Sequence, residues 1–511
     1  MSDNSKNSRR IAKNTIVLYI RMLFLMVVNL YTSRVILDAL GVDDYGIYNV
    51  VGGFVSMFAL ISAALTSACS RFLNFELAKG DLERQKVVFS TAVGIQWGLA
   101  IIVAVLSEAI GIWYVNNVMV LPSERLTAAN WCFQFSVFTF CMNLITVPYN
   151  ASIVAHEKMK TFAYVGIFQG VAQLGISFLV YLEPFDRLIF YALLLMILQF
   201  IVRFMYQHYC RVHFAECKYK FVFDTPLLKQ MLGYSAWHLI GNGASVLKTH
   251  GVNLVLNLFF GPAINAAKGV ANQVESAVHQ FVSNFMMAMN PQITQSYARE
   301  DYGYFLKLIS KGSRYCFYLM FILSLPIIVN ADYIMDLWLK EVPEYAVAFA
   351  QLTLISAMVS SITNPLITAQ NATGDVRNFQ IIIGGINLLN LPLSYVALYF
   401  GMSPTSVVMV SILVNVIAVF TRIMILPNTV KCFNRKDFFV DVLLRCLFVA
   451  VVSSFIAVGI DKVIPETFYG FLINVTMIVV TSGCVILYIG CDAHERNFFY
   501  SKALQIIKRN K

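Results

Sequence analysis

Apolar residues run along this chain in long unbroken stretches, and short segments between them carry most of the charge. A helix needs about 20 mostly apolar residues to cross the hydrocarbon core of a membrane. The stretches reach that length and lack the short apolar–polar alternation of a membrane β-barrel strand. We therefore read them as fourteen transmembrane helices, at residues 14–38, 45–70, 87–113, 126–154, 161–182, 188–208, 231–259, 263–291, 315–338, 345–369, 379–400, 405–426, 443–461 and 469–490.

The composition agrees with a membrane protein. Of the 511 residues, 58% are hydrophobic and only 13% are charged, against about 25% charged in a typical soluble domain. A soluble enzyme, a secreted disulfide scaffold, a disordered chain and a coiled coil all fit this composition poorly. The fold class we predict is an all-α polytopic membrane protein. Its net charge of +10 then indicates cytoplasmic loops and lipid headgroups rather than nucleic acid.

The distribution of Lys and Arg predicts how the chain is oriented. With the N-terminus in the cytoplasm, 30 of the 38 Lys and Arg fall in segments on that side, six lie on the other side and two lie inside spans. Cytoplasmic loops carry such an excess of positive charge. We expect a multi-pass protein of the bacterial cytoplasmic (inner) membrane, with both termini cytoplasmic. The first apolar stretch contains Arg21 and lacks a cleavage site of small residues, so we read it as a span rather than a signal peptide.

A weak internal repeat appears when the chain is compared with itself at an offset of about 220 residues. This offset covers six spans, an even number, so both halves enter the membrane in the same orientation. Such parallel repeats place a substrate site between the halves near the membrane midplane. The matched residues are Gly41 with Gly261, Ala78-Lys79-x-Asp81 with Ala298-Arg299-x-Asp301, and Thr146-x-Pro148 with Thr363-x-Pro365.

The repeat predicts two six-helix lobes followed by two further helices. Pro148 and Pro365 occupy equivalent repeat positions and are expected to be hinges, because proline bends a membrane helix. The predicted layout is a cytoplasmic tail at 1–13, an N-lobe at 14–208, a cytoplasmic inter-lobe loop at 209–230, a C-lobe at 231–426, two last spans within 427–490, and a basic cytoplasmic tail at 491–511.

Polar residues inside spans are the candidates for chemistry, because each one is costly in lipid unless it faces protein or water. Arg21 lies about eight residues into the first span, or about 12 Å deep at 1.5 Å per residue. Its side chain either reaches back to the cytoplasmic headgroups or faces a central cavity. The same two readings apply to Arg34, near the outer end of that helix.

The seventh and eighth spans form an unusually polar hairpin. Lys248 lies 13 residues before Gly261 and Glu275 lies 13 residues after Pro262, so antiparallel helices place both at one depth. We expect these two side chains to face each other, with His279 one turn from Glu275. They form either a structural ion pair or a charge pair that rearranges when an anion or a proton arrives, with Glu275 and His279 as coupling candidates.

Three amide side chains on the same hairpin complete the predicted substrate site. Asn242, Asn272 and Gln273 are expected to offer hydrogen bonds to a polar substrate. Neither a phosphate-binding GxxxxGK[ST] loop nor a metal-binding HExxH sequence is present. We therefore expect no enzyme activity, no cofactor and no metal.

The stretch RVILDALGVDDYGIYNV at 34–50 and the segment Pro148-Tyr149-Asn150 running into His156-Glu157-Lys158 resemble a known family. These features are similar to the Wzx-type O-antigen or capsule repeat-unit flippases of the multidrug/oligosaccharidyl-lipid/polysaccharide exporter superfamily. The resemblance implies a V-shaped bundle that moves an undecaprenyl-pyrophosphate-linked oligosaccharide across the inner membrane for lipopolysaccharide or capsule biosynthesis. It also implies a binding role for Arg21 and Arg34, and suggests contact with membrane lipids, a polysaccharide polymerase and glycosyltransferases.

Lys248 and Arg21 could attract the diphosphate, since Lys and Arg are suited to that task. Three alternatives remain open. A cation-coupled multidrug exporter of the same superfamily would be expected to have twelve spans and a mid-span carboxylate in its first lobe. A non-transporting scaffold of a polysaccharide synthase would not need a polar interior, and a membrane glycosyltransferase would normally show an acidic motif in a loop.

Overall fold

The structure is a computed structural model. It describes residues 2–56, 58–117, 123–182, 186–218, 224–260, 262–339, 342–465, 467–493 and 495–497, apart from some side chains within these helices.

All regular elements of the described residues are helices, which confirms the predicted fold class. Eleven of them are long and apolar enough to cross a membrane. The predicted spans missing from this set are 45–70, 231–259 and 263–291. The last two correspond to α8 (Thr225–Phe260) and α9 (Pro262–Ala298), which are 36 and 37 residues long. Both helices are long enough for a span, so it is their polar residues, and not their length, that keep them out of this set.

The described chain divides into two compact units. The first unit comprises Met1–Asn242 and Met287–Glu300, and the second comprises Gly243–Met286 and Asp301–Lys511. Both α8 and α9 therefore pass from one unit to the other part-way along their length. The predicted lobe boundaries stay a prediction. The described inter-lobe segment is shorter than the predicted loop, because α7 continues to His213 and α8 begins at Thr225.

The first unit is built from seven helices besides its shares of α8 and α9. Gly41 has φ 78° and ψ 170°, so α1 is two helices that meet at this residue, as expected from the predicted break between spans 1 and 2. The helices are α1 (Ser2–Ser56), α2 (Ala59–Lys79), α3 (Leu82–Leu106), α4 (Ile112–Asn117), α5 (Leu126–Ala155), α6 (Met159–Leu179) and α7 (Arg187–His213).

The second unit contains ten further helices and its shares of α8 and α9. These are α10 (Tyr302–Val329), α11 (Ala331–Trp338), α12 (Ala346–Ser361), α13 (Asn364–Thr373), α14 (Arg377–Leu388), α15 (Asn390–Tyr399), α16 (Ser406–Ile425), α17 (Arg435–Phe438), α18 (Arg445–Asp461) and α19 (Phe468–Val485).

Local geometry repeats along the chain where the sequence repeat predicts it. Asp81 caps α3 by accepting from the Arg84 N–H at 3.1 Å, and Asp301 caps α10 by accepting from the Tyr304 N–H at 3.1 Å. Such a cap satisfies an otherwise unpaired amide of the first helical turn. The residue before each cap has a positive φ in both copies, Gly80 in one and Glu300 in the other. The repeat is thus visible as the same turn, made by different residues.

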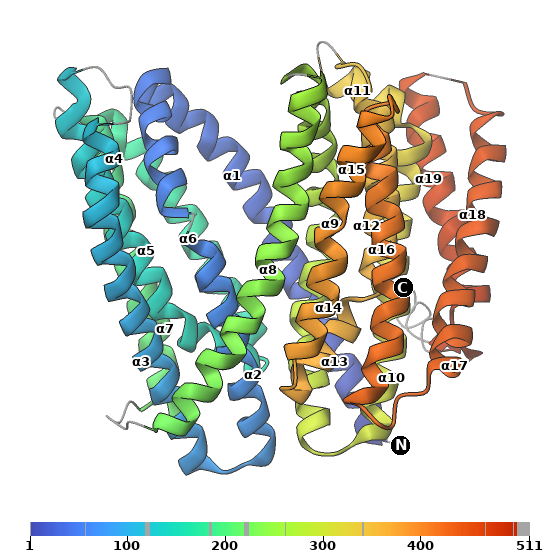
Figure 1. The fold of residues 1–511 in the computed structure, drawn as a ribbon, viewed down its shortest axis with the longest axis horizontal. Coiled ribbons are helices and arrows are strands. Elements are labelled where there is room, and N and C mark those ends of the chain that lie inside the picture. Colours follow the sequence, from blue (N-terminus) through green and yellow to red (C-terminus); the bar gives the residue numbers. More distant parts are fainter. Residues whose placement is uncertain are drawn as a thin grey trace, which may run out of the picture. The chain divides into compact units, whose positions relative to one another are not determined.

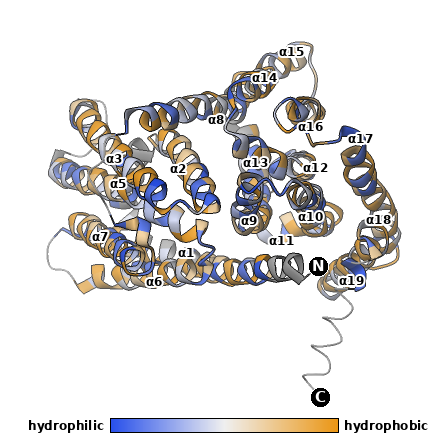
Figure 2. Cartoon of the chain, turned by 90° about the horizontal axis from the view of Figure 1, so that it is seen from below, coloured by the Kyte–Doolittle hydropathy of each residue, from blue (hydrophilic) through white to orange (hydrophobic). Residues whose placement is uncertain are grey.

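One central helix organises each unit. In the first, α5 packs against α2, α3 and α7, and in the second α10 packs against α12, α13, α18 and α19. Figures 1 and 2 show α3 and α5 running side by side, and likewise α18 and α19. Phe89 and Phe133 in the first unit and Phe305 and Phe349 in the second are fully buried. Because lipid is as apolar as these side chains, close packing rather than water exclusion stabilises such contacts.

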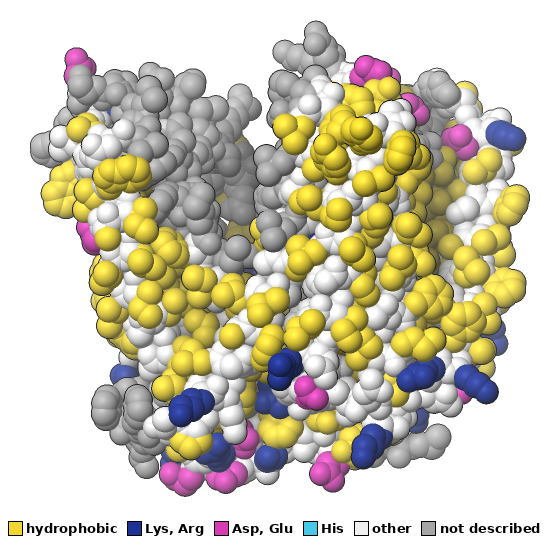
Figure 3. All heavy atoms as spheres, viewed as in Figure 1, with side chains coloured by type: hydrophobic (Ala, Val, Ile, Leu, Met, Phe, Trp, Pro, Cys, Tyr) yellow, Lys and Arg dark blue, Asp and Glu magenta, His cyan; other side chains and the backbone are white. Residues whose placement is uncertain are grey.

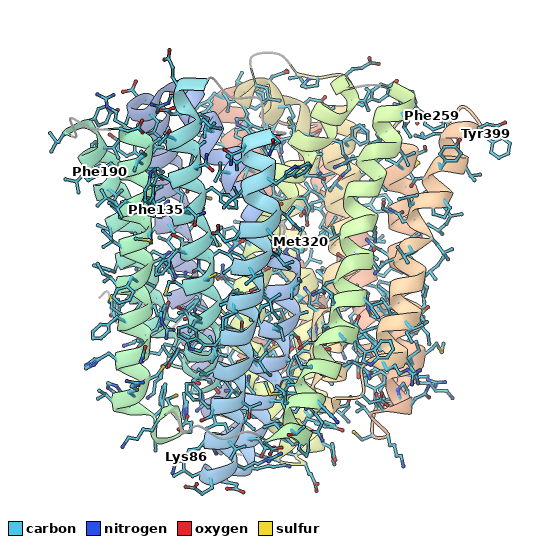
Figure 4. The ribbon with its side chains drawn as sticks, turned by 60° about the vertical axis from the view of Figure 1, so that its left-hand side comes forward. Lys86, Phe135, Phe190, Phe259, Met320 and Tyr399 are labelled. Carbon is cyan, nitrogen blue, oxygen red and sulfur yellow. The ribbon has the colours of Figure 1, made fainter. Side chains whose placement is uncertain are left out.

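The outer surface is apolar over the length of a span. Leu413, Ile417, Phe420 and Met424 form an exposed stripe along α16, and hydrophobic side chains cover this part of the second unit in Figure 3, with charged ones gathered toward its upper and lower edges. In the first unit, Lys86 lies at one end of α3 (Figure 4). A surface of this kind suits a lipid environment.

Candidate functional site

A polar cavity of about 190 Å³ lies inside the second unit. Five helices form its walls, namely α8, α9, α12, α15 and α16. Polar groups dominate the lining, although the helices around it are apolar outside. The polar lining residues are Lys248, Asn253, Lys268, Asn272, Glu275, Thr353, Ser356, Ser360, Asn390, Ser411 and Asn415.

Lys248 is held by two neutral amides. Its ammonium donates to Asn415 Oδ1 at 2.6 Å and to Asn387 Oδ1 at 3.5 Å. The Asn415 amide nitrogen in turn donates to Ser356 Oγ at 2.9 Å, which orients the amide oxygen toward the lysine. The positive charge is therefore solvated by the protein but not neutralised by these partners.

Lys268 is the second cation of the cavity. Its ammonium donates to Asn272 Oδ1 at 2.7 Å and to Thr353 Oγ1 at 3.0 Å. Glu275 interacts electrostatically with both Lys268 and His279, and it lines the same cavity. The lining thus holds two ammonium groups and one carboxylate, and a net positive charge at this depth favours an anionic ligand.

Asn390 adds a hydrogen-bond donor that has no partner within the described residues. Its side chain is 1% exposed, and its Nδ2 is buried without an acceptor. The amide oxygen of the same side chain is used, because it accepts from Ser411 Oγ at 3.2 Å. A buried donor without an acceptor is costly, so a ligand oxygen in the cavity would complete its bonding.

The structure brings three of the predicted residues together, since Lys248, Asn272 and Glu275 all line the cavity. Among the described residues, no ion pair joins Lys248 to Glu275, so the expected direct pairing is absent. Asn387 and Asn415, on helices distant in sequence, take up the lysine instead, and the hairpin geometry alone gave no sign of them. Gln273 is exposed on α9, one position round the helix from Asn272.

The remaining predicted residues lie elsewhere. His279 is half-buried and bonds Ser283 Oγ through Nδ1 at 3.1 Å. Asn242 is half-buried on α8, in the first unit. The side chain of Arg34 lies outside the described residues.

Arg21, in the first unit, lies against α6. Its guanidinium sits over the Phe162 ring at 4.4 Å from the centroid, and its Nε has no hydrogen-bond partner within the described chain. A Cβ on Gly166 would lie 2.3 Å from that Nε, so only glycine at this position lets the arginine lie flat on the helix. Arg21 thus packs between two helices of its own unit.

The two predicted hinge prolines differ in their local structure. Pro148 lies inside the continuous helix α5. Pro365 lies in the first turn of α13, just after the chain breaks off from α12 at Ser361. Proline is tolerated in a first turn because its missing N–H is unpaired there anyway.

Sequence reasoning missed Lys268, Asn390 and Asn415. The charge count placed Lys268 at the outer end of the eighth predicted span, which agrees with its position near the start of α9, but the predicted site left it out. Its spacing from Asn272 and Glu275 is four and seven residues, which puts all three on one helix face. That stripe was a signal for Lys268. The two asparagines gave a weaker signal: Asn387 precedes Asn390 by three residues and Ser411 precedes Asn415 by four, in otherwise apolar segments. Within the described residues, no three His, Cys, Asp or Glu side chains are grouped as metal ligands.

Comparisons with known proteins give the same fold. The family model named MatE matches residues 249–396, the part of the chain that contains α9 and most of the cavity wall. A solved structure of an outward-facing multidrug resistance MATE family transporter of the MOP superfamily superposes with a TM-score of 0.71 at 11% identity, covering 83% of this chain and 96% of the other. The chain has the fold of the MATE transporters.

Two further solved structures share this fold, and their descriptions point to different functions. A variant of the Vibrio cholerae MATE transporter VcmN has a TM-score of 0.69 at 15% identity, with 86% of this chain and 100% of that one covered. A MOP superfamily transporter from Pyrococcus furiosus, described as having a binding pocket of reverse polarity that suggests a different function, has a TM-score of 0.66 at 11% identity, with 84% and 96% covered. No curated protein matches the sequence. The family model matches less than a third of the chain, so these comparisons show a MATE-like fold and single out no substrate class.

Proposed function

We propose that this chain is a flippase that moves an undecaprenyl-pyrophosphate-linked oligosaccharide across the bacterial inner membrane for surface polysaccharide biosynthesis. The observation that carries the proposal is the surplus of donors in the cavity of the second unit. Lys248 and Lys268 supply ammonium groups, and the buried Asn390 Nδ2 has no acceptor among the described residues. A diphosphate offers the oxygens and the negative charge that these groups lack.

The roles within the proposed site follow from these partners. Lys248 and Lys268 bind the charged phosphates, and Asn390 donates to a phosphate or sugar oxygen. Asn272 and the cavity hydroxyls bond the sugars, and Glu275 releases Lys268 when the anion enters. The lipid tail stays in the bilayer, so that only the headgroup needs a polar route. The proposed orientation has both termini in the cytoplasm, where glycosyltransferases would supply the substrate.

A transport assay tests the proposal. The full-length chain is reconstituted into liposomes with a fluorescent short-chain polyprenyl-diphosphate disaccharide, and movement between leaflets is followed by a quencher added outside. Lys248→Met and Lys268→Met should each lower the rate by about tenfold or more, because a bond to a charged group contributes about 1.5–3 kcal/mol. The matched control is Lys307→Met, an exposed lysine of the second unit. Equal rates in all four proteins would exclude the cavity as the binding site, and rates no higher than in protein-free liposomes would exclude the flippase.

A cation-coupled multidrug exporter is the second candidate. It is favoured by the multidrug MATE structures, which share the fold, and by the carboxylate of Glu275 in the cavity. Under this reading Glu275→Gln abolishes export of a cationic dye from proteoliposomes, while Lys268→Met leaves it unchanged or raises it. Under the flippase reading, dye export is absent from the wild type.

A further inference from the structure

In each unit, an arginine on the last helix of the predicted six-helix repeat contacts the chain a few residues before a proline. Arg203 lies on α7 and Arg422 on α16, 219 residues apart, close to the 217-residue separation of Pro148 and Pro365. Both arginines lie toward the cytoplasmic ends of the predicted spans 188–208 and 405–426, and the structure places them inside α7 and α16. Neither lines the cavity.

In the first unit, Arg203 Nη1 donates to the carbonyl oxygen of Ile145 at 3.0 Å. The helical hydrogen bond that Pro148 cannot donate is the one to the Leu144 carbonyl, and Ile145 is the next residue in that turn. In a membrane, donors from neighbouring helices help to satisfy the backbone around such a proline. Trp97 and Tyr149 flank the guanidinium, with ring centroids 5.9 and 5.7 Å from its central carbon.

The second unit makes the equivalent contact through a side chain. Arg422 Nη1 donates to Thr363 Oγ1 at 3.2 Å, and that hydroxyl donates to the Ser360 carbonyl at 2.7 Å. Ser360 and Thr363 flank the point where α12 ends and α13 begins, just before Pro365. The Thr363 hydroxyl thus links Arg422 to the Ser360 carbonyl at the end of α12. The regular backbone hydrogen bonding of the helix ends at this point.

We infer that Arg203 and Arg422 are repeat-related positioning residues, each of which fixes the backbone geometry around the proline site of its own unit. They act on the backbone at the proline rather than on a ligand. An arginine serves here because its planar guanidinium donates in a fixed direction while it stacks on aromatic rings, which an ammonium does not do. The expected effect of the two arginines on transport rests on the proposed function, whereas their effect on the backbone geometry at the prolines does not.

Electron-spin distance measurements test the inference on the full chain in lipid nanodiscs. The distance between nitroxides at Thr127 and Lys160 reports on the geometry of α5 around Pro148. The distance between a second pair, at Glu344 and Asp375, reports on the break between α12 and α13. All four residues are exposed. The native thiols to be removed first are the exposed Cys432 and Cys484.

Arg203→Met should broaden the distance distribution of the first pair and leave the second unchanged, and Arg422→Met should do the reverse. Arg203→Lys, which keeps the charge and one donor, should give an intermediate width. The matched control is Arg211→Met, because Arg211 is an exposed arginine on the same helix as Arg203.

A second substitution separates a local role from general loosening. Pro148→Ala restores the missing amide, so the double variant with Arg203→Met should recover a narrow distribution. Broadening of both pairs by either arginine variant, or a double variant as broad as Arg203→Met, would overturn the inference.

In the liposome assay, Arg203→Met should slow flipping several-fold and the double variant should recover part of that loss. If the wild type moves no lipid-linked glycan, the proposed function fails while the distance measurements still decide the role of the two arginines.

Discussion

The two units treat their cations differently, although they share a repeat. In the first, arginines meet carboxylates at helix ends or lie on rings: Arg125 bonds Asp186 at 2.6 Å and also Asp44, and Arg21 rests on Phe162. The second unit also pairs Arg314 with Asp492 and Glu495, but its Lys248 and Lys268 bond neutral amides and a hydroxyl around a cavity. Charges that are already paired or packed favour structure, whereas charges solvated by neutral groups stay available for a ligand. The comparison supports the proposal that the ligand binds in the second unit.

The largest effect should come from reversing the polarity of the cavity at one atom. Asn390→Asp replaces the unpartnered Nδ2 by a carboxylate oxygen, which repels an anion and attracts a cation. Flipping of the diphosphate glycan should fall by about tenfold or more, given about 1.5–3 kcal/mol for a bond to a charged group.

The same variant distinguishes the two candidate functions. Asn390→Leu, which only removes the donor, should cost less than Asn390→Asp. A gain of cationic dye export in Asn390→Asp, with glycan flipping absent throughout, would turn the assignment toward a drug exporter.

The close fit of Arg21 on α6 predicts an effect on stability in the first unit. Gly166→Ala sets a Cβ against the guanidinium, 2.3 Å from Nε, so the arginine or the helix must move. Because Nε belongs to the far end of a flexible side chain that can shift, the loss should fall at the low end of the about 1–3 kcal/mol of overpacking, measured as a lower midpoint of thermal unfolding in detergent.

Gly175→Ala on the same helix is the matched control, because a Cβ there meets nothing within 4 Å. Its midpoint should stay at the wild-type value or rise slightly. Equal behaviour of the two alanine variants would remove the argument that Arg21 needs this glycine.

Two buried carboxylates outside the spans should respond to pH in opposite senses. In the first unit, burial raises the pKa of Glu157, although Arg10 and Gln292 favour its charged form. In the second, burial opposes ionisation of Glu495, but the Asp492 N–H, Arg314 and Lys311 outweigh it and lower the pKa.

The signs follow from proton binding. Folded Glu157 holds a proton that the unfolded chain releases, so its contribution to stability falls as pH rises above the ordinary carboxyl range. Unfolded Glu495 binds a proton that the folded chain does not, so its contribution is present at neutral pH and is lost as pH falls through that range. Melting of Glu157→Gln and Glu495→Gln from pH 4 to 8, each relative to wild type, should therefore slope in opposite directions. Parallel slopes would contradict the contrast between the units.

The smallest effect is expected at the exposed end of α3. Lys86 bonds Glu83 at 2.6 Å, but the glutamate side chain is 71% exposed. An exposed pair contributes about 0–1 kcal/mol, so Lys86→Met should leave both the melting midpoint and the flipping rate near the wild-type values. A large loss would mean that surface charge, rather than the cavity, determines the stability and the flipping rate of this protein.

The sequence alone determined the class of fold, because burial in lipid forces long apolar helices whose lengths and breaks are local properties. Gly41, the caps at Asp81 and Asp301, and the polarity of the hairpin with Lys248, Asn272 and Glu275 were all readable for this reason. Tertiary structure decided which partner each buried charge meets. Lys248 bonds Asn387 and Asn415, more than 130 residues away along the chain. Hairpin depth fixes how far a side chain lies from the turn, but the neighbouring helices fix the direction in which it finds a hydrogen bond.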